Sequence, residues 1–348
     1  MRKKVFCRNI AIGGGEPVSI QSMTNVDSHD GQALLQQISR LKDAGCDIVR
    51  IAIPDMEAAS TLAEIRKETD IPLVADIHFD YRLAIAAIEA GADKIRINPG
   101  NIGDVNRVRA VVEAAKHHGV PIRIGVNSGS LEKDILEKNG GVTAEGLAES
   151  ALRNVALVEE MGYDQLVVSL KSSNVLMNTQ AHKIVAEKTD YPIHIGITEA
   201  GTLKRGKVKS AIGIGALLLD GIGDTLRVSL TADPVEEVYY AREILEALDL
   251  RTPRVNLVSC PTCGRTKVDL QALAEEADRR LAQISVNPGL KVAVMGCAVN
   301  GPGEAREADY GIAGGEGKGL IFARGQVLKT VREEDLIDEL INVITEEQ

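Results

Sequence analysis

Short apolar runs alternate with amphipathic helical patterns over most of the chain, and this alternation restricts the fold more than any other feature. Eight runs have the length and the Ile/Val/Leu content of strands: 17–23, 47–53, 71–77, 94–100, 121–127, 165–171, 192–198 and 224–230. Helical patterns follow many of them, for example at 31–45, 56–69, 104–119 and 235–249. Strands that alternate with helices predict βαβ units, in which consecutive strands are parallel.

Eight such units favour a closed (β/α)8 barrel of the TIM type over an open, doubly wound sheet. The open sheet stays an alternative, although no GxGxxG follows the first strand to support its dinucleotide-binding form. Aromatic residues make up only 3% of the chain and Trp is absent, so the core has to be built from Ile, Val, Leu and Ala. This composition suits parallel strands that are covered by helices.

The pattern of the sequence changes near residues 250–253. Beyond this point we expect short strands in a different order, with helices at about 270–284 and 333–345. The chain of 348 residues is long enough for two domains. We therefore predict a barrel over residues 1–250 and a smaller α/β domain over residues 251–348.

The formal net charge of −10 argues against a nucleic-acid-binding protein, which needs a basic surface. The N-terminal segment begins with basic residues but has no long apolar run, so we expect neither a signal peptide nor a membrane anchor. These observations predict a cytoplasmic protein without a membrane partner. An anionic ligand would have to be bound by a local cluster of Arg and Lys.

Charged residues recur at the predicted carboxyl ends of the strands, where barrels bind their ligands. Five of them are basic: Arg50, Arg96, Arg123, Lys171 and Arg227. Charges inside parallel strands are costly unless they are paired or bind a ligand, and Arg and Lys suit phosphate oxygens. The pattern predicts a doubly phosphorylated or diphosphate ligand. The alternative is a structural network in which the cations pair with nearby acids.

Other polar residues lie at the same strand ends: Asp76, His78, Asn98, Asn127, Glu199 and Ser229. We predict that they line the same site as the basic residues. His78 or His194 taken alone could equally be a hydrogen-bonded core histidine, so neither carries a mechanism.

Three of the five cysteines, Cys260, Cys263 and Cys297, are concentrated in the C-terminal domain. Disulfides are rare in the cytoplasm, and a CxxC turn lets two thiolates bind one metal centre. No His follows His194 to complete a zinc site, whereas Glu304 stands in a glycine-rich loop after the third cysteine. A 4Fe–4S cluster held by three cysteines would leave one iron for such an oxygen ligand. Zinc with three Cys and one acid, or a dithiol redox pair, remain alternatives.

The segments SCPTCGRT and MGCAVNGPGEA resemble the cluster-binding signature of the 4-hydroxy-3-methylbut-2-enyl diphosphate synthase family. Barrel segments are similar to the same family: SIQSMTN, VRIAIPD, ADIHFD, KIRINPGN, RIGVNSGS, SLKSSN, GITEAG and RVSLT. The resemblance covers essentially the whole chain. It implies a TIM-type barrel that binds the substrate diphosphate, followed by a domain with a 4Fe–4S cluster.

The resemblance also implies the reaction, which is the reductive ring opening of 2-C-methyl-D-erythritol 2,4-cyclodiphosphate in isoprenoid biosynthesis. The implied cluster ligands are Cys260, Cys263, Cys297 and Glu304, of which Glu304 would yield to a substrate oxygen. Glu199 would be the acid nearest the reacting carbons and a proton donor. The implied contacts of the cyclic diphosphate are Arg50, Arg123, Asn127, Lys171, Arg227 and Ser229, and we predict Asp76, His78, Arg96 and Asn98 as further substrate-binding residues.

The family further implies flavodoxin or ferredoxin as the electron donor. It implies a homodimer in which the cluster domain of one subunit covers the barrel of the other. Two other functions remain open from the residues: a zinc-stabilised barrel that isomerises or condenses a phosphorylated substrate, and a non-catalytic iron–sulfur carrier. Metal analysis would distinguish the zinc-stabilised barrel from an iron–sulfur enzyme. The cationic strand ends disfavour the carrier, which would not need them.

Overall fold

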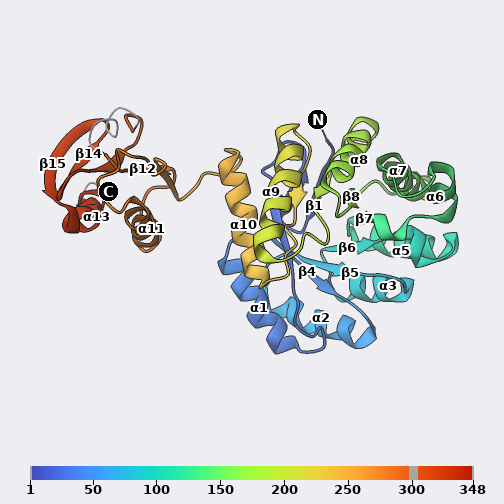
Figure 1. Ribbon diagram of the computed structural model, residues 1–348. Coiled ribbons are helices and arrows are strands. Elements are labelled where there is room, and N and C mark those ends of the chain that lie inside the picture. The colour runs from blue at the N-terminus through green and yellow to red at the C-terminus, as the bar shows by residue number, and fades with distance from the viewer. Residues whose placement is uncertain (1, 298–304, 347–348) are drawn as a thin grey trace. The chain divides into compact units, whose positions relative to one another are not determined.

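The computed structural model divides the chain into two compact units, Met1–Arg251 and Thr252–Gln348 (Figure 1). It describes residues 2–297 and 305–346. Within these residues, no helix has the length and apolar character needed to cross a membrane.

The first unit is a barrel of parallel strands. In the described part of the chain these strands are β3 (Ser19–Met23), β4 (Ile48–Ala52), β5 (Leu73–Asp76), β6 (Lys94–Ile97), β7 (Ile122–Asn127), β8 (Leu166–Lys171), β9 (His194–Ile195) and β10 (Thr225–Leu226). They pair in the order β8-β7-β6-β5-β4-β3-β10-β9. A parallel bridge between Val168 and Ile193 then joins β8 to β9 and closes the ring. The predicted (β/α)8 barrel is confirmed, and the open sheet is excluded.

Helices connect the strands and surround them on the outside (Figure 1). They are α1 (Gly31–Asp43), α2 (Met56–Glu68), α3 (Tyr81–Glu89), α4 (Pro99–Ile102), α5 (Val105–His118), α6 (Lys133–Asn139), α7 (Ala144–Glu160), α8 (Val175–Lys188), α9 (Leu203–Leu219) and α10 (Pro234–Ala247). Several begin at an N-cap that the sequence provides. The Asp55 carboxylate, for example, accepts a hydrogen bond from the Ala58 amide at the start of α2.

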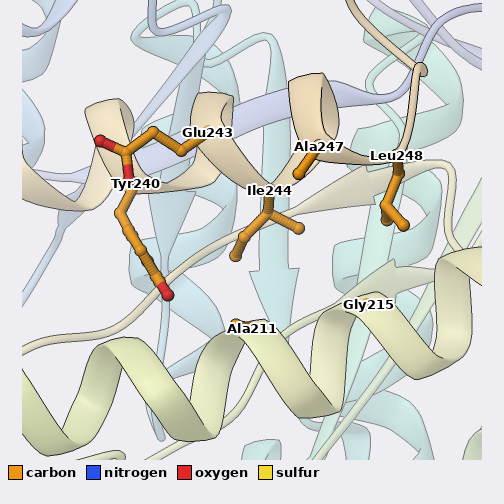
Figure 2. A pocket seen from close by; sticks show the side chains of 7 residues that line it. All are labelled: Ala211, Gly215, Tyr240, Glu243, Ile244, Ala247 and Leu248. Atoms are coloured by element: carbon orange, nitrogen blue, oxygen red, sulfur yellow. The ribbon is translucent and has the colours of Figure 1, made fainter. Parts of the chain in front are cut away.

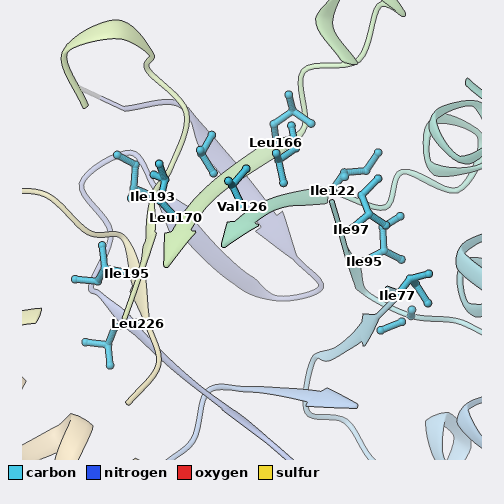
Figure 3. Close-up of a cluster of buried hydrophobic side chains, with 14 of the residues drawn as sticks. Ile77, Ile95, Ile97, Ile122, Val126, Leu166, Leu170, Ile193, Ile195 and Leu226 are labelled. Atoms are coloured by element: carbon cyan, nitrogen blue, oxygen red, sulfur yellow. The ribbon is translucent and has the colours of Figure 1, made fainter. Parts of the chain in front are cut away.

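The apolar side chains of the strands pack against the helices (Figure 3). Ile95 and Ile97 of β6 and Leu166 and Leu170 of β8 belong to the same buried cluster as the apolar faces of the surrounding helices. Because successive residues of a strand face opposite sides, the intervening residues face the barrel interior. These intervening positions carry most of the polar residues of the strands.

An N-terminal hairpin, which the sequence analysis did not predict, precedes the barrel. Its strands β1 (Lys4–Cys7) and β2 (Ile10–Gly13) are antiparallel. Cys7 and Ile12 of the hairpin pack against Ile48 and Val74, which lie at the amino ends of β4 and β5. We call the end of the barrel formed by the carboxyl ends of the strands the mouth. The hairpin closes the opposite end.

The second unit contains a mixed sheet with helices packed against it. In the described residues the strands are β11 (Val255–Ser259), β12 (Leu290–Met295), β13 (Tyr310–Gly314), β14 (Lys318–Ala323) and β15 (Gln326–Arg332), paired in chain order. The first three strands are parallel and the last two run antiparallel to their neighbours. The helices α11 (Leu270–Leu281) and α13 (Leu336–Glu346) pack against the sheet in a separate core.

Candidate functional site

The strand registers arrange the barrel interior in layers, each with residues from alternate strands. Gln21, Val74, Arg123 and His194 form the middle layer. The layer nearer the hairpin contains Ile48, Lys94, Val167 and Thr225, and the layer nearer the mouth contains Arg50, Arg96, Ser169 and Arg227. Barrels of this type are usually filled with branched apolar residues. This interior is polar at most positions, which indicates a ligand site rather than a filled core.

Basic side chains dominate the interior. We call the following residues the interior cations: Arg50, Lys94, Arg96, Arg123, Lys171 and Arg227. All are less than one fifth exposed. Because a buried cation is stable only when it is paired or binds an anion, their partners show which of them are free for a ligand.

Asp76 at the end of β5 pairs with two interior cations. Its carboxylate lies 3.2 Å from Arg96 Nη1 and 3.8 Å from Arg50 Nε. Burial alone would raise the pKa of Asp76, but the guanidinium groups of Arg50 and Arg96 outweigh it and lower this pKa to about 2. The sequence analysis predicted Asp76 as a substrate contact. In the structure it is a charged partner that fixes two arginines.

Arg227 has a partner that the sequence analysis missed. Glu237 of α10 lies 3.2 Å from the Arg227 guanidinium and also accepts hydrogen bonds from Ser22 Oγ and the Leu230 amide. Glu237 is buried among the apolar residues of α10. An acid on the buried face of an amphipathic helix is the signal that could have identified it.

Arg123, Lys171 and His194, like Lys94 nearer the hairpin, have no carboxylate partner among the described residues. Two nitrogens of Arg123 and both ring nitrogens of His194 are buried without a hydrogen-bond partner among the described residues. Burial, together with the charges of Arg123 and Lys171, lowers the pKa of His194 well below 6.5, so its ring is neutral. His194 is therefore not the hydrogen-bonded core histidine that the sequence left open. A buried group without a partner calls for water or a ligand.

The two asparagines at the mouth have different surroundings. Asn98 caps α4, because its Oδ1 accepts from the Gly100 amide at 3.2 Å, and its Nδ2 reaches Ser130 Oγ at 3.4 Å. With its amide oxygen turned toward the interior, Asn127 accepts from Arg96 Nη2 at 3.2 Å. Asn127 can therefore orient a guanidinium group, while Asn98 has a local structural role.

The remaining predicted contacts lie farther out. His78 is more than half exposed, and its Nε2 lies 3.9 Å from the Asp76 carboxylate. Glu199 is exposed and adopts a left-handed backbone with φ of 52°. Such a conformation is strained for a residue other than Gly and often occurs at functional sites. Ser229 is half-buried after β10.

His29 joins two loops of the mouth through both of its ring nitrogens. Its Nδ1 lies 2.7 Å from Asp27, and its Nε2 lies 3.0 Å from Asp55, which follows β4. The carboxylates of Asp55 and Asp27 raise the pKa of His29 above 6.5. The raised pKa means that this bridge stabilises the fold fully below pH 6.5 and is lost as the pH rises through the higher, folded-state value.

We expect an NMR titration of the His29 ring to show a midpoint above 6.5. Asp55→Asn should lower this midpoint more than Asp27→Asn, because the Asp55 contact is the larger cause of the shift. Asn can still cap α2 in the first variant. A midpoint at or below 6.5 in the unmodified protein would show that the bridge is not formed in solution.

A groove on the outer helix layer is a different kind of site. It lies between α9 and α10 (Figure 2), and its lining residues are Ala211, Gly215, Tyr240, Glu243, Ile244, Ala247 and Leu248. The lining is mostly apolar, and its one charged residue is an acid. It therefore does not suit an anionic substrate, unlike the polar interior at the mouth of the barrel.

The predicted cluster ligands in the second unit follow two adjacent parallel strands. Ser259 at the end of β11 pairs with Val294 of β12. Cys260 and Gly296 come next after these strands, and the Gly296 amide donates to Cys260 Sγ at 3.3 Å. Cys297 follows directly, so the topology brings it to the same edge of the sheet as Cys260.

Cys263 is exposed in the turn after Cys260. The backbone amide of Arg265 and the Thr266 hydroxyl donate to its sulfur and lower the pKa of Cys263 below 9.0. A thiolate is the form that binds metals. Glu304, the fourth predicted ligand, lies outside the described residues.

The donor set fits an iron–sulfur cluster in its chemistry. Cys260 and Cys297 follow adjacent strands at one edge of the sheet, Cys263 comes three residues after Cys260, and amide and hydroxyl groups donate to the sulfurs of Cys260 and Cys263, as is common around such clusters. Within residues 2–297 and 305–346, no group of three or more His, Cys, Asp or Glu side chains is arranged to hold a metal ion. The cysteines therefore meet the chemical requirement, although their side chains are not gathered around a common centre.

Two family models match the chain. The GcpE TIM-barrel domain matches residues 2–242, and the GcpE protein C-terminal domain matches residues 256–346. The chain belongs to the GcpE family.

Proteins named 4-hydroxy-3-methylbut-2-en-1-yl diphosphate synthase (flavodoxin) are similar to this GcpE chain over nearly their whole length. The one from Caldanaerobacter subterraneus is 58% identical over 99% of this chain and 96% of its own, and the one from Clostridium acetobutylicum is 55% identical over 98% and 97%. The family resemblance seen in the motifs is confirmed.

Solved structures of another enzyme share the barrel. Dihydropteroate synthase from Yersinia pestis has a TM-score of 0.52 at 17% identity and covers 72% of this chain and 99% of its own. The enzyme from Stenotrophomonas maltophilia has a TM-score of 0.52 at 14% identity, covering 71% and 97%. At these identities the likeness concerns the fold alone.

Proposed function

We propose that this GcpE chain catalyses the reductive dehydration and ring opening of 2-C-methyl-D-erythritol 2,4-cyclodiphosphate in isoprenoid biosynthesis. The product is 4-hydroxy-3-methylbut-2-enyl diphosphate. Two electrons and two protons enter, and one water leaves. The observation that carries the proposal is that the interior cations outnumber the carboxylates around them. Buried cations without such partners need an anionic ligand, and a diphosphate is one.

In this proposal the barrel binds and orients the cyclic diphosphate. Arg50, Arg123, Lys171 and Arg227 contact the phosphate oxygens, and Ser229 and Asn127 contribute hydrogen bonds. The pairs that Arg50 forms with Asp76 and that Arg227 forms with Glu237 hold these guanidinium groups in place before the ligand arrives.

The remaining mouth residues have supporting roles. Arg96 is fixed by Asp76 and adds positive charge, while His78 and Asn98 border the site. Glu199 is the exposed acid on the loop after β9 and the proposed proton donor to the departing hydroxyl group.

Cys260, Cys263, Cys297 and Glu304 would hold a 4Fe–4S cluster, which supplies electrons and a Lewis-acidic iron when bound. The Gly296 amide and the Thr266 hydroxyl stabilise negative charge on the sulfurs of Cys260 and Cys263. Flavodoxin is the proposed electron donor, as the names of the relatives state for those proteins. A homodimer in which each cluster domain covers the partner's barrel remains a prediction, which sedimentation equilibrium would test.

The function is tested by metal analysis and turnover of anaerobically purified protein. We expect about four irons and four sulfides per chain, and conversion of the cyclodiphosphate when reduced flavodoxin is supplied. Cys297→Ser should lose both the iron and the turnover, whereas Cys46→Ala, which changes a buried cysteine of the barrel, should retain them. One zinc without sulfide, together with no turnover, would refute the proposal and support the zinc-stabilised alternative.

Arg227→Ala is expected to weaken cyclodiphosphate binding by about 1.5–3 kcal/mol, because a charge-assisted contact is lost. The same change leaves the buried Glu237 without its cation, so Glu237→Gln is the matched control for disturbance of the pair. Calorimetric titration measures both dissociation constants. If Arg227→Ala binds as tightly as the unmodified protein, Arg227 does not contact the diphosphate.

A further inference from the structure

The interior cations are not balanced by the carboxylates around them. Asp76 is occupied by Arg96 and Arg50, and Glu237 by Arg227. No other carboxylate in the described part of the chain pairs with an interior cation. If every group were charged, the six interior cations would face only these two acids among the described residues.

Lys171 is the interior cation best placed to relieve this imbalance by losing its proton. It ends β8, is only 7% exposed, and its side chain forms no hydrogen bond or ion pair with any described residue. Arginine stays protonated in proteins, whereas a buried lysine deprotonates readily. The titratable and charged groups around it are Arg50 (β4), Asp76 (β5), Arg96 (β6), Arg123 (β7), His194 (β9), Arg227 (β10) and His182 (α8).

Lys94 is the only other lysine among the described interior cations, and its position is less favourable. It lies in the layer nearest the N-terminal hairpin, where its Nζ is buried without a partner in the described chain. Arg123 lies in the layer between Lys94 and the mouth. An anion that enters from the mouth therefore reaches Lys171 before Lys94.

We propose that the barrel takes up a proton when it binds the cyclic diphosphate, and that Lys171 is the group that receives it. The inference rests on the proposed function, since it takes the cyclodiphosphate as the ligand. Without ligand, an ammonium at Lys171 would add to the uncompensated charge of the arginines. Two negative charges brought in by the ligand reverse this balance and favour the protonated amine.

The pKa shifts agree with this geometry. Burial lowers the pKa of Lys171 well below 10.5, and the charges of Arg123 and Arg50 lower it further. Burial also lowers the pKa of Lys94, to about 8. Because the ligand raises the pKa of Lys171, proton uptake occurs at pH values between the free and the bound pKa. The affinity for the cyclodiphosphate falls as the pH rises through this interval.

The test is calorimetric titration of the cluster-loaded protein with the cyclodiphosphate, without an electron donor so that no turnover occurs. Titrations at one pH in Pipes, Hepes and Tris, whose ionisation enthalpies differ, give the number of protons taken up from the slope of the observed heat. We expect up to about one proton per site, and an affinity that falls by up to about tenfold per pH unit in the interval of uptake. Both results come from the unmodified protein and need no variant to fold.

Two variants locate the proton. Lys171→Arg keeps the positive charge but cannot release a proton, so it should bind the ligand without proton uptake. Lys94→Met should retain the uptake. Uptake that persists in Lys171→Arg, or that disappears only in Lys94→Met, overturns the assignment to Lys171. Binding without any uptake by the unmodified protein overturns the proposal and leaves the proposed function standing, whereas no binding at all removes both.

Discussion

Asp76→Asn is expected to lower the free energy of unfolding by about 3–5 kcal/mol, because it removes one partner of a buried ion pair and leaves the other charges uncompensated. The change preserves the volume of the side chain, so the loss reports charge rather than packing. Arg96 and Arg50 both depend on this carboxylate, at 3.2 and 3.8 Å. Urea denaturation with and without the cyclodiphosphate measures the effect.

The ligand should restore part of the lost stability, since its phosphates supply negative charge to the same guanidinium groups. Asp80→Asn is the matched control, because Asp80 pairs with Arg82 at the surface and Asn can still cap α3. We expect a change below about 1 kcal/mol for this control. Equal effects of the two substitutions would show that Asp76 does not act as the counter-ion of the interior.

Asp76 also predicts an acid limit for the fold. Its pKa is about 2 in the folded state and 3.8 ordinarily. A group with a lowered folded-state pKa stabilises the fold at pH values above the ordinary pKa, and this contribution is lost as the pH falls through the folded-state pKa. The unmodified protein should therefore lose stability between about pH 4 and pH 2 in a step that Asp76→Asn lacks.

The sequence predicted the barrel because its strands leave a strong local signal. All eight apolar runs contain a strand of the described barrel, including the two-residue strands β9 and β10. The hairpin of β1 and β2 was missed, because it lies outside the alternation of strands and helices. Its apolar residues are buried only through contact with the barrel. Cys7 and Ile12 are buried there only because the amino ends of the barrel strands lie above them.

The sequence predicted which residues line the candidate site, but not which of them form ion pairs with one another. The basic residues at the strand ends are visible in the sequence because charges interrupt apolar runs. Which acid pairs with which cation depends on register: the position of Glu237 on the buried face of α10 marks it as unusual, but the sequence does not assign it to Arg227, ten residues away. The lowered pKa of His194 likewise follows from its burial in the closed barrel and from cations on other strands.

The polar interior has a consequence for the way in which the barrel is held together. Its apolar residues pack outward against the helices, as Figure 3 shows, so the helices supply most of the core. The interior then has little apolar material to offset its charges. The strands that carry the interior cations must therefore be held together by their backbone contacts. Where two strands approach closely near the mouth, the contact affects both the stability of the barrel and ligand binding.

Gly196→Ala is expected to destabilise the protein by about 3 kcal/mol and to abolish tight diphosphate binding, because a Cβ at this position cannot be accommodated. Such a Cβ would lie 2.5 Å from the Arg227 carbonyl oxygen and 3.5 Å from Lys171 Nζ. Relief of the backbone clash requires β9 and β10 to move apart at the mouth, which displaces two of the proposed phosphate contacts together. Unfolding experiments and calorimetric titration measure the two effects.

Gly215→Ala is the matched control with the opposite sign. Gly215 lies within α9, and a Cβ there would meet nothing within 4 Å. Alanine in a helix interior is favoured over glycine by about 0.5–1 kcal/mol, so this variant should be slightly more stable and bind normally. If Gly196→Ala were also neutral, β9 and β10 would not approach as closely as the structure has them. The proposed contacts of Lys171 and Arg227 with one ligand would then lose their geometric basis.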